Sequence, residues 1–483
     1  MADAKALTPR AEDFSAWYNE VIVRAELADY SPVRGCMVIR PNGYAIWEQM
    51  QQALDAMFKE TGVENAYFPL FIPQSFLARE AEHVAGFAPE TAVVTHAGGK
   101  ELEEPLVVRP TSETIIYAML AKWIQSYRDL PVLLNQWVNV VRWELRTRLF
   151  LRTTEFLWQE GHTAHATEAE AEEEARLILA IYRRFAEEWM AMPVLTGLKS
   201  ESERFAGALR TYALEALMQD NRGLQAGTSH HLGQNFARAF DVTFQTADGG
   251  LDYVWSTSWG VSTRLIGGLI MTHGDDVGMV CPPRLAQWQA VIVPIYRSDD
   301  ERSRVLEAAE RLRHELKAAG LRVTADLREG MKPGAKYYEW EARGVPFRLE
   351  LGPRDLAAGQ AMVARRTGGK AAMPLAGLAT GLRDEVERMQ SALLATARER
   401  REANSIRGAT RADLLERMAG EGGGGFVYGG WCGSAGCETE IKQQTKATIR
   451  VLPDQEFRSD PAPERCLWCD APSVMEAVWA KAY

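Results

Sequence analysis

The chain has 483 residues, of which 46% are hydrophobic and 25% are charged, and its formal net charge is −10. This length exceeds one hydrophobic core and predicts two or three domains. The acidic balance excludes a protein coated in basic patches, so any nucleic-acid contact must be local. No run of about 18 apolar residues occurs, so no membrane span is expected, and Met1–Arg10 lacks the apolar core of a signal peptide. These features favour a cytoplasmic protein.

The first region combines long helical patterns with a short strand. Apolar residues at helical spacing predict helices over 13–27 and 44–61, and Gly62 follows the second as a helix-ending residue. Segment 65–71 is interpreted as an edge strand, because Pro69 cannot donate to a central ladder. A long helix followed by such a strand suggests a dimer seam, with a plain edge strand as the alternative.

The string Arg109-Pro-Thr-Ser-Glu113 lies between a short strand over 106–108 and a helix over 113–125. Thr111 or Ser112 is expected to cap that helix. Such a cap would bring hydroxyls, a carboxylate and free backbone N–H groups to one point. The string is therefore a candidate binding loop, and an ordinary helix cap is the alternative.

A hairpin over 137–162 carries the densest set of functional residue types. Its first strand leads through Arg142 and Glu144 into a loop with three arginines, Arg146, Arg148 and Arg152. Alternation along the second strand places four side chains on one face, Phe156, Trp158, Glu160 and His162. Arginine forks suit polyphosphate and carboxylate groups, an aromatic face suits a stacked base, and a carboxylate suits an ammonium. The alternative is an exposed charged hairpin with an aromatic core face.

The region from 167 to 271 adds two further candidates behind an acidic helix over 167–192, which is interpreted as scaffold. The polar, glycine-bearing segment 225–234 is expected to be a site loop or a tight turn. Gly260 and Arg264 predict a glycine-marked helix start, where backbone and guanidinium can approach a phosphate together. Close helix packing is the alternative explanation of the glycines.

Pro282-Pro283 marks the first domain boundary. Beyond it, strands over 290–294, 322–326, 347–351 and 362–366 and helices over 299–319 and 333–343 predict a small α/β domain. Segment 321–370 holds ten Lys and Arg against six Asp and Glu, which is a local basic excess in an acidic chain. A helix over 382–402 and a flexible glycine joint over 421–425 precede the last unit.

Four of the six cysteines lie near the end of the chain, Cys432, Cys437, Cys466 and Cys469. Thiolates at these spacings can reach one tetrahedral Zn²⁺, and four of them fill its coordination, so a structural site is expected. Disulfides are the alternative, which a reducing compartment disfavours. His162 and His165 form a weaker candidate metal pair. The chain has no Walker-type glycine loop, so a nucleotide would bind without a P-loop.

These strings together resemble a class II aminoacyl-tRNA synthetase, and closely a prolyl-tRNA synthetase of the archaeal and eukaryotic-like type, along essentially the whole chain. Tyr67-Phe-Pro69 resembles the first family motif at the dimer interface, 142–160 the second and 260–264 the third. Segments 109–113 and 227–231 resemble loops of the proline pocket. Gly344-Val-Pro-Phe-Arg348 and Gly352-Pro-Arg-Asp355 resemble strings of the anticodon-binding domain.

The fold class implied by the resemblance is α/β (α+β). It comprises an antiparallel-sheet catalytic domain over 1–283, an α/β anticodon-binding domain over 284–404, and a small zinc-containing C-terminal α+β domain over 405–483. The implied activity is ATP-dependent ligation of L-proline to tRNA(Pro) through prolyl-adenylate, with Mg²⁺ accompanying ATP and a structural Zn²⁺. The protein is expected to be a cytoplasmic homodimer that does not bind membranes.

The resemblance also implies site residues. Arg142 and Arg264 are the implied catalytic residues. The implied proline-binding set is Thr111, Glu113, Arg142, Trp158, Glu160, His162, His230, Ser258 and Phe87. The implied ATP-binding set is Arg142, Glu144, Arg152, Thr153, Phe156, Gln225, Thr228, Ser262 and Arg264. The implied anticodon-reading set is Glu341, Arg348, Arg354 and Asp355. The family's last residue sends its carboxylate toward the active site, which Tyr483 would do here.

An editing domain is expected to be missing. Bacterial-type relatives carry a long editing insertion between the second and third motifs, whereas 93 residues separate His162 from Ser256. Two other functions are weighed against this one. A different class IIa synthetase, such as threonyl or glycyl, is disfavoured by the 109–113 string and the four cysteines. A non-catalytic tRNA-binding paralogue is disfavoured because Arg142 and Arg264 are both present.

Overall fold

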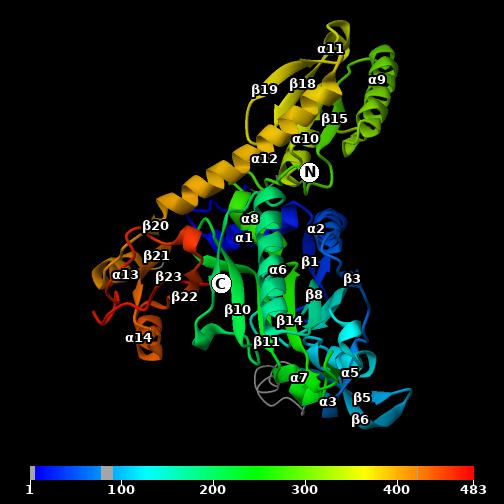
Figure 1. The fold of residues 1–483 in the computed structure, drawn as a ribbon. Coiled ribbons are helices and arrows are strands. Elements are labelled where there is room, and N and C mark those ends of the chain that lie inside the picture. The colour runs from blue at the N-terminus through cyan, green and yellow to red at the C-terminus, as the bar shows by residue number, and fades with distance from the viewer. Residues whose placement is uncertain (1–5, 78–90, 421) are drawn as a thin grey trace.

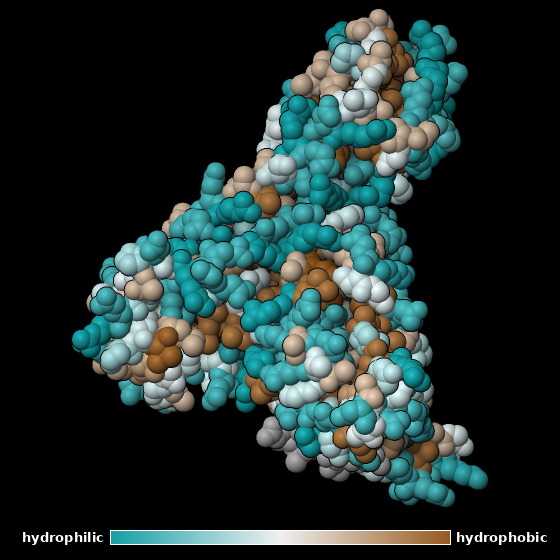
Figure 2. All heavy atoms as spheres, viewed as in Figure 1, coloured by the Kyte–Doolittle hydropathy of each residue, from teal (hydrophilic) through white to brown (hydrophobic). Residues whose placement is uncertain are grey.

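The computed structural model describes residues 6–77, 91–420 and 422–483. A large body holds the first half of the chain, a smaller C-terminal unit lies beside it, and a further domain projects away (Figure 1). The long helix α12 (Leu378–Ala403) runs from the projecting domain to the C-terminal unit (Figure 1). In the described part of the chain, no helix is both long and apolar enough to cross a bilayer. On the side drawn in Figure 2, hydrophilic residues dominate the surface and hydrophobic ones form small, separate patches.

The centre of the body is an 11-stranded sheet that continues into the C-terminal unit. Its strand order is β20-β21-β23-β22-β9-β10-β11-β14-β8-β7-β3, antiparallel except at the edge pairs β20–β21 and β3–β7. In that order the bounds are Ser405–Ile406, Phe426–Trp431, Met475–Ala480, Thr448–Pro453, Val194–Leu198, Arg210–Leu217, Gly223–Gly233, Trp255–Ser262, Glu155–His165, Val132–Val141 and Glu64–Asn65. The antiparallel sheet expected for the catalytic region is confirmed.

The predicted hairpin is the β7–β8 pair, whose register runs from Val132 opposite Ala164 to Val141 opposite Glu155. Helix α6 (Glu168–Glu188) covers one face of the sheet (Figure 1), and Thr167 and Glu170 close its start as a reciprocal capping box. The other helices of the body are α1 (Phe14–Arg24), α2 (Pro41–Lys59), α3 (Gln74–Leu77), α5 (Glu113–Trp123), α7 (Asn235–Phe240) and α8 (Arg264–His273). A helix and a sheet each bury one apolar side this way, which leaves the other sheet face available for a site.

Three small sheets of the body are separate from the large one. Strands β1 (Ala28–Tyr30) and β2 (Met37–Ile39) pair with each other, as do β12 (Thr243–Gln245) and β13 (Leu251–Tyr253). A three-stranded sheet contains β4 (Phe71–Pro73), β6 (Lys100–Val108) and β5 (Ala92–Ala97) in that order. The single strand predicted over 65–71 is therefore wrong, because the chain leaves the large sheet before Pro69 and pairs again only at Phe71.

Two further sequence predictions are wrong within the body. Segment 225–234 belongs mainly to strand β11 in the middle of the sheet, and Gly260 lies in β14, paired with Thr228 and Glu160. Helix α8 begins only at Arg264. Both errors have one cause: polar and small residues in a central strand look like a loop until their neighbours in the sheet are known.

The projecting domain confirms the predicted alternation of strands and helices. Its five-stranded sheet has the order β16-β15-β17-β18-β19. Its strands are β15 (Ala290–Pro294), β16 (Val323–Ala325), β17 (Phe347–Leu351), β18 (Gln360–Arg365) and β19 (Lys370–Pro374), and its helices are α9 (Asp299–Ala318), α10 (Pro333–Ala342) and α11 (Pro353–Ala357). Pro333 and Pro353 both stand at helix starts, where the missing N–H costs nothing.

The C-terminal unit packs its helices α13 (Arg411–Arg417) and α14 (Ala435–Thr445) with β20–β23. Its strand β22 pairs with β9, placing Leu452 opposite Leu198. Gly425 N donates to the carbonyl oxygen of Asn221 at 2.7 Å. The glycines predicted as a flexible joint are therefore tied to the body at this point, because a glycine backbone can approach another backbone closely.

Candidate active site

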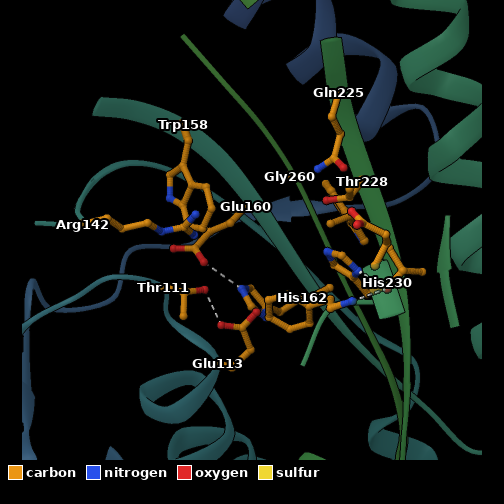
Figure 3. A pocket seen from close by; sticks show the side chains of 15 residues that line it. Thr111, Glu113, Arg142, Trp158, Glu160, His162, Gln225, Thr228, His230 and Gly260 are labelled. Carbon is orange, nitrogen blue, oxygen red and sulfur yellow. Dashed lines mark hydrogen bonds and ion pairs between the residues drawn. The ribbon is translucent and has the colours of Figure 1, made fainter. Parts of the chain in front are cut away.

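Two adjoining cavities open on the sheet face that α6 leaves uncovered. The first, of about 270 Å³, is lined by Thr111, Glu113, Arg142, Trp158, Glu160, His162, Glu203, Phe205, Thr211, Gln225, Thr228, His230, Ser258, Trp259 and Gly260. The second, of about 240 Å³, is lined by Arg142, Glu144, Phe150, Leu151, Arg152, Thr153, Phe156, Ser262 and Arg264. Arg142 lines both cavities. Figure 3 shows its side chain reaching in beside Trp158 and Glu160, opposite His230 and Thr228.

The structure brings most of the sequence-predicted residues together. All members of the predicted proline set line the first cavity except Phe87, which lies outside the described residues. Gln225 and Thr228, predicted for ATP, also line the first cavity, whereas the rest of the ATP set lines the second. Sequence reasoning missed Glu203, Phe205, Thr211 and Trp259 of the first cavity and Phe150 and Leu151 of the second. Thr211 stands opposite His230 in the β10–β11 pair, so only the strand register could have indicated it.

Glu160 is the centre of a buried polar network in the first cavity. Gln136 Nε2 donates to Glu160 Oε1 at 2.7 Å, and Ser112 Oγ donates to the same oxygen. His162 Nε2 lies 3.0 Å from Glu160 Oε2. Glu160 is 2% exposed, and a buried carboxylate is tolerated only when hydrogen bonds replace its hydration. The network therefore fixes the orientation of Glu160 before any ligand arrives.

The 109–113 string forms another wall of this cavity. Thr111 Oγ1 donates to Glu113 Oε2, and Ser112 stands at the N-cap position of α5 without a side-chain capping bond. The predicted side-chain cap is therefore wrong, because both hydroxyls bind buried carboxylates instead. Arg109 anchors the string by donating to the carbonyl oxygens of Phe68 and Asn139, at 2.7 and 2.8 Å.

The two histidines of the first cavity differ in charge preference. Burial alone would lower the pKa of His162, but the Glu160 and Glu113 carboxylates outweigh burial and raise it above its usual value. Burial lowers the pKa of His230 to about 4. His230 Nδ1 lies 3.0 Å from Thr211 Oγ1, and its ring stacks on Phe205 with centroids 4.5 Å apart. A neutral, flat surface thus faces an acidic one across the cavity.

Four buried polar atoms of residues that line the first cavity have no hydrogen-bond partner among the described residues, Trp158 Nε1, His162 Nδ1, Ser258 Oγ and Trp259 Nε1. A buried unpaired donor or acceptor costs about 1–3 kcal/mol. Such a cost is offset when a ligand supplies the missing partner. The cavity therefore suits a small molecule with its own polar groups.

Three arginines and two phenylalanines, Phe150 and Phe156, dominate the lining of the second cavity. Arg142 Nε donates to the Pro110 carbonyl oxygen at 3.0 Å, and its guanidinium lies over the rings of Trp158 and Phe156, at 5.2 and 5.6 Å. Arg152 pairs with Glu144 at 3.2 Å. Burial, followed by the repulsion of Arg142 and Arg152, lowers the pKa of Arg264 to about 10, so it stays protonated at neutral pH. Three arginines beside the Phe156 ring suit a purine nucleotide with its phosphates.

The predicted anticodon residues lie in the projecting domain, far from these cavities along the chain. Arg348 pairs with Glu341 and, at 3.2 Å, with Glu350, and its guanidinium lies 3.9 Å from the Tyr337 ring centroid. Arg354 follows Pro353 in the short helix α11 and is exposed. Asp355 accepts a hydrogen bond from Gly352 N at 2.9 Å. The four residues come from α10, β17 and α11 of the same domain.

The four clustered cysteines have free thiols, and their sulfur atoms all lie within 4.8 Å of one another. Cys432 and Cys437 are 3.6 Å apart, and Cys432 and Cys469 are 3.7 Å apart. Four sulfurs about 2.3 Å from one Zn²⁺ would stand roughly 3.8 Å apart at tetrahedral angles. The donor set thus fits a closed zinc site. His165 lies on β8 with Nε2 2.7 Å from Thr163 Oγ1, and among the described residues neither His162 nor His165 belongs to a cluster of three or more potential metal ligands.

Comparisons with known proteins identify the family. The tRNA synthetase class II core domain (G, H, P, S and T) matches residues 94–273, the anticodon binding domain matches 289–385, and the C-terminal domain of prolyl-tRNA synthetase matches 418–483. A proline--tRNA ligase of Chloroherpeton thalassium is 57% identical over 486 residues, covering 99% of this chain and 100% of that one. Proline--tRNA ligases of Chlorobium luteolum and Chlorobaculum tepidum are 57% and 56% identical with the same two coverages. The chain therefore belongs to the prolyl-tRNA synthetase family of class II aminoacyl-tRNA synthetases.

Proposed function

We propose that this protein ligates L-proline to tRNA(Pro) in an ATP-dependent reaction through a prolyl-adenylate intermediate. The observation that carries the proposal is the pair of cavities that meet at Arg142. One cavity has the size and polarity for a small amino acid, and the other has the cations and the aromatic ring for a nucleotide. Arg142 would therefore contact the reacting carboxylate and the α-phosphate at once.

Proline binding would use the acidic side of the first cavity. The proline ammonium would bind at Thr111 and Glu113, while Trp158, His162 and His230 would enclose the ring. Glu160 and Ser258 would complete that pocket, with Phe87 proposed to close over it. Because the carboxylate network is already hydrogen-bonded, little reorganisation would be needed on binding.

ATP would occupy the second cavity with adenine stacked on Phe156. Arg142 would hold the α-phosphate, and Arg152 and Arg264 the outer phosphates. Glu144, Thr153, Gln225, Thr228 and Ser262 would help to place the nucleotide. Mg²⁺ bound with ATP would supply further neutralisation of the phosphate charge.

The chemical step would then need positioning and charge neutralisation. A proline carboxylate oxygen attacks the α-phosphorus in line, which forms the prolyl-adenylate and releases pyrophosphate. The terminal ribose of the tRNA then attacks the activated carbonyl and releases AMP. Neither step requires a protein base, because the attacking carboxylate is already ionised and the proton of the attacking ribose hydroxyl can pass to the departing AMP phosphate.

The remaining domains would serve tRNA binding and structure. Arg348, Arg354, Asp355 and Glu341 would read the guanines of the proline anticodon, because arginine suits guanine O6 and N7 and carboxylates suit exocyclic amines. A Zn²⁺ held by the four cysteines would cross-link the end of the C-terminal unit. The division into domains over 1–283, 284–404 and 405–483 is part of the same proposal.

We also propose that the protein is a cytoplasmic homodimer of the archaeal and eukaryotic-like type without an editing insertion. Between His162 and Ser256, the chain forms α6, α7, strands of the large sheet and the β12–β13 pair. A proline pocket should reject the smaller alanine by only about 1–3 kcal/mol. The enzyme would therefore form some alanyl-adenylate and would not hydrolyse Ala-tRNA(Pro) itself. Hydrolysis by the purified protein would contradict this proposal.

The test of the proposed function is ATP–pyrophosphate exchange with a panel of amino acids in the absence of tRNA. Exchange driven by L-proline, with alanine far behind, is the expected result. Exchange driven by threonine or glycine would reassign the first cavity to another amino acid. No exchange from folded protein would indicate a non-catalytic tRNA-binding protein.

A further inference from the structure

A buried ionic cluster joins the C-terminal unit to the catalytic sheet. Glu215 on β10 has a fully buried side chain and binds two cations. Lys199 Nζ lies 2.8 Å from Glu215 Oε1, and Arg450 donates to Glu215 from Nη2 at 2.8 Å and from Nε at 3.1 Å. Lys199 Nζ also donates to the carbonyl oxygen of Arg450 at 2.7 Å. Arg450 comes from β22, so the cluster crosses between the two units.

Stability alone is a weak explanation of this cluster. A buried ion pair usually contributes no more than well-packed apolar residues of similar volume would, because both charges lose their hydration. Burial by itself would raise the pKa of Glu215, and Arg450 and Lys199 outweigh it and hold that pKa below its usual value. Glu215 is therefore held as an anion inside the sheet.

Both partners lie at interruptions of strand register. Between β10 and β11 the register shifts so that Glu215 stands opposite Gln225, and Ala226 is the extra residue. Between β22 and β23 the extra residue is Arg450. A bulge re-aims side chains, and bulges are frequent beside active sites. Here the first bulge puts Gln225 with Thr228 in the lining of the first cavity, while Arg450 at the second bulge meets Glu215.

Arg450 also contacts the start of the strand that carries Gln225. A Cβ on Gly223 would lie 3.4 Å from Arg450 Nε. The arginine side chain therefore passes directly over Gly223, which has no side chain of its own. Gly223 N donates to the carbonyl oxygen of Lys481 at 2.8 Å. The C-terminal unit thus holds β11 two residues before Gln225.

The cluster also acts on the cations of the second cavity. Burial, Arg142 and Arg152 have the largest effects on the pKa of Arg264. Smaller effects come from Glu215, which raises this pKa, and from Arg450, which lowers it. Glu215 and Arg450 are therefore close enough for their charges to be felt where phosphates are proposed to bind. Removing either charge would change the balance of charge around Arg264.

We propose that Arg450 is a positioning residue for ATP. Through Glu215 and Gly223 it fixes the part of β11 that carries Gln225, a residue of the first cavity that we have proposed to help place the nucleotide rather than proline. It also balances the charge beside Arg264, without touching the nucleotide itself. The C-terminal unit would in this way control nucleotide affinity without contributing a residue to the lining of either cavity. This inference rests on the proposed function of the two cavities.

The test uses the full-length protein with Arg450→Met, Arg450→Lys and a control, Arg458→Met. Arg458 lies in the same unit, is exposed, and its Nε donates only within that unit, to the Pro453 carbonyl oxygen at 2.9 Å. Proline-dependent pyrophosphate exchange gives KM for each substrate, and calorimetry without amino acid gives Kd for ATP. We expect Arg450→Met to raise KM and Kd for ATP about 10–100-fold, the size of effect expected when hydrogen bonds to a buried charged group are lost. KM for proline should change far less, Arg450→Lys should recover most of the ATP affinity, and Arg458→Met should match the unmodified protein.

Equal losses for ATP and proline, or a lower kcat at unchanged KM values, would overturn the proposal and leave Arg450 as a structural contact. If Arg450→Met does not fold, Arg450→Gln, which keeps a donor toward Glu215, decides by the same criterion. A different failure would refute the proposed function, namely unmodified protein that shows no proline-dependent exchange at all.

Discussion

Gln136 offers a sharp test of the carboxylate network, because it touches no proposed ligand position. Its Nε2 donates to Glu160 Oε1 at 2.7 Å and to Ser112 Oγ at 3.0 Å, and its Oε1 accepts from Phe68 N at 3.0 Å. In Gln136→Met the side chain keeps its length and loses all three bonds. A hydrogen bond to a charged group contributes about 1.5–3 kcal/mol, and leaving Phe68 N–H unpaired costs about 1–3 kcal/mol.

Two consequences should follow from this loss. The urea midpoint should fall, because buried polar groups lose their partners. KM for proline should rise about 10–100-fold if most of the free energy of the Gln136–Glu160 hydrogen bond serves to hold Glu160 in its binding orientation. KM for ATP should stay close to its unmodified value, because Gln136 lies outside the lining of the second cavity.

The matched control is Gln159→Met. Gln159 is as deeply buried, donates to Asn135 Oδ1 at 2.8 Å and accepts from the Tyr182 hydroxyl at 2.7 Å, but it lines neither cavity. It should lose stability with little change in KM for proline. If the two variants raised KM for proline equally, the network would not orient Glu160, and our reasoning would be refuted.

Four shorter predictions follow from the other sites. Arg142→Lys should lower proline-dependent exchange about 10²–10³-fold, because one ammonium cannot replace a planar fork at a developing charge; a loss below tenfold would argue against its dual contact. Cys466→Ser should remove the bound zinc, seen as less than one zinc per chain by metal analysis, with a lower Tm; a full zinc complement would contradict the four-cysteine site. Arg354→Ala should raise KM for tRNA by the factor that corresponds to about 1–3 kcal/mol, without changing ATP–pyrophosphate exchange; an unchanged KM for tRNA would remove Arg354 from the anticodon set. Burial lowers the pKa of His273 to about 4, so between about pH 6.5 and 4 only the unfolded chain takes up its proton and the unfolding free energy falls on acidification; His273→Gln, compared by urea titration, should flatten that decline.

Most residues of the site could be predicted from short sequence motifs. The β7–β8 hairpin supplies Arg142, Trp158 and Glu160 within one continuous segment, so strand alternation alone placed the last two on one face. The helices and strands of the projecting domain were also predicted closely, because each carries its own periodicity and flanking turn residues. Local sequence determines hairpins, helices and single strands of this kind because they depend mainly on residues that are close together along the chain.

The errors share a different origin. Strand β11 was predicted as a loop because polar side chains are typical of loops, and its pairing with β10 and β14 cannot be read from the local sequence. Ser112 was predicted as a helix cap because the competing carboxylate of Glu160 lies 48 residues away. In both cases a contact distant in sequence outweighed the local preference.

The sequence by itself therefore determined which residue types are present and which short elements carry them, including the family strings and the four cysteines. Only the tertiary structure decided that Gln136 supports Glu160 and that Phe205 stacks on His230. It also decided that β22 extends the catalytic sheet and brings Arg450 to Glu215. The reason is physical: burial, register and ion pairing depend on which surfaces meet when strands far apart in the chain pair.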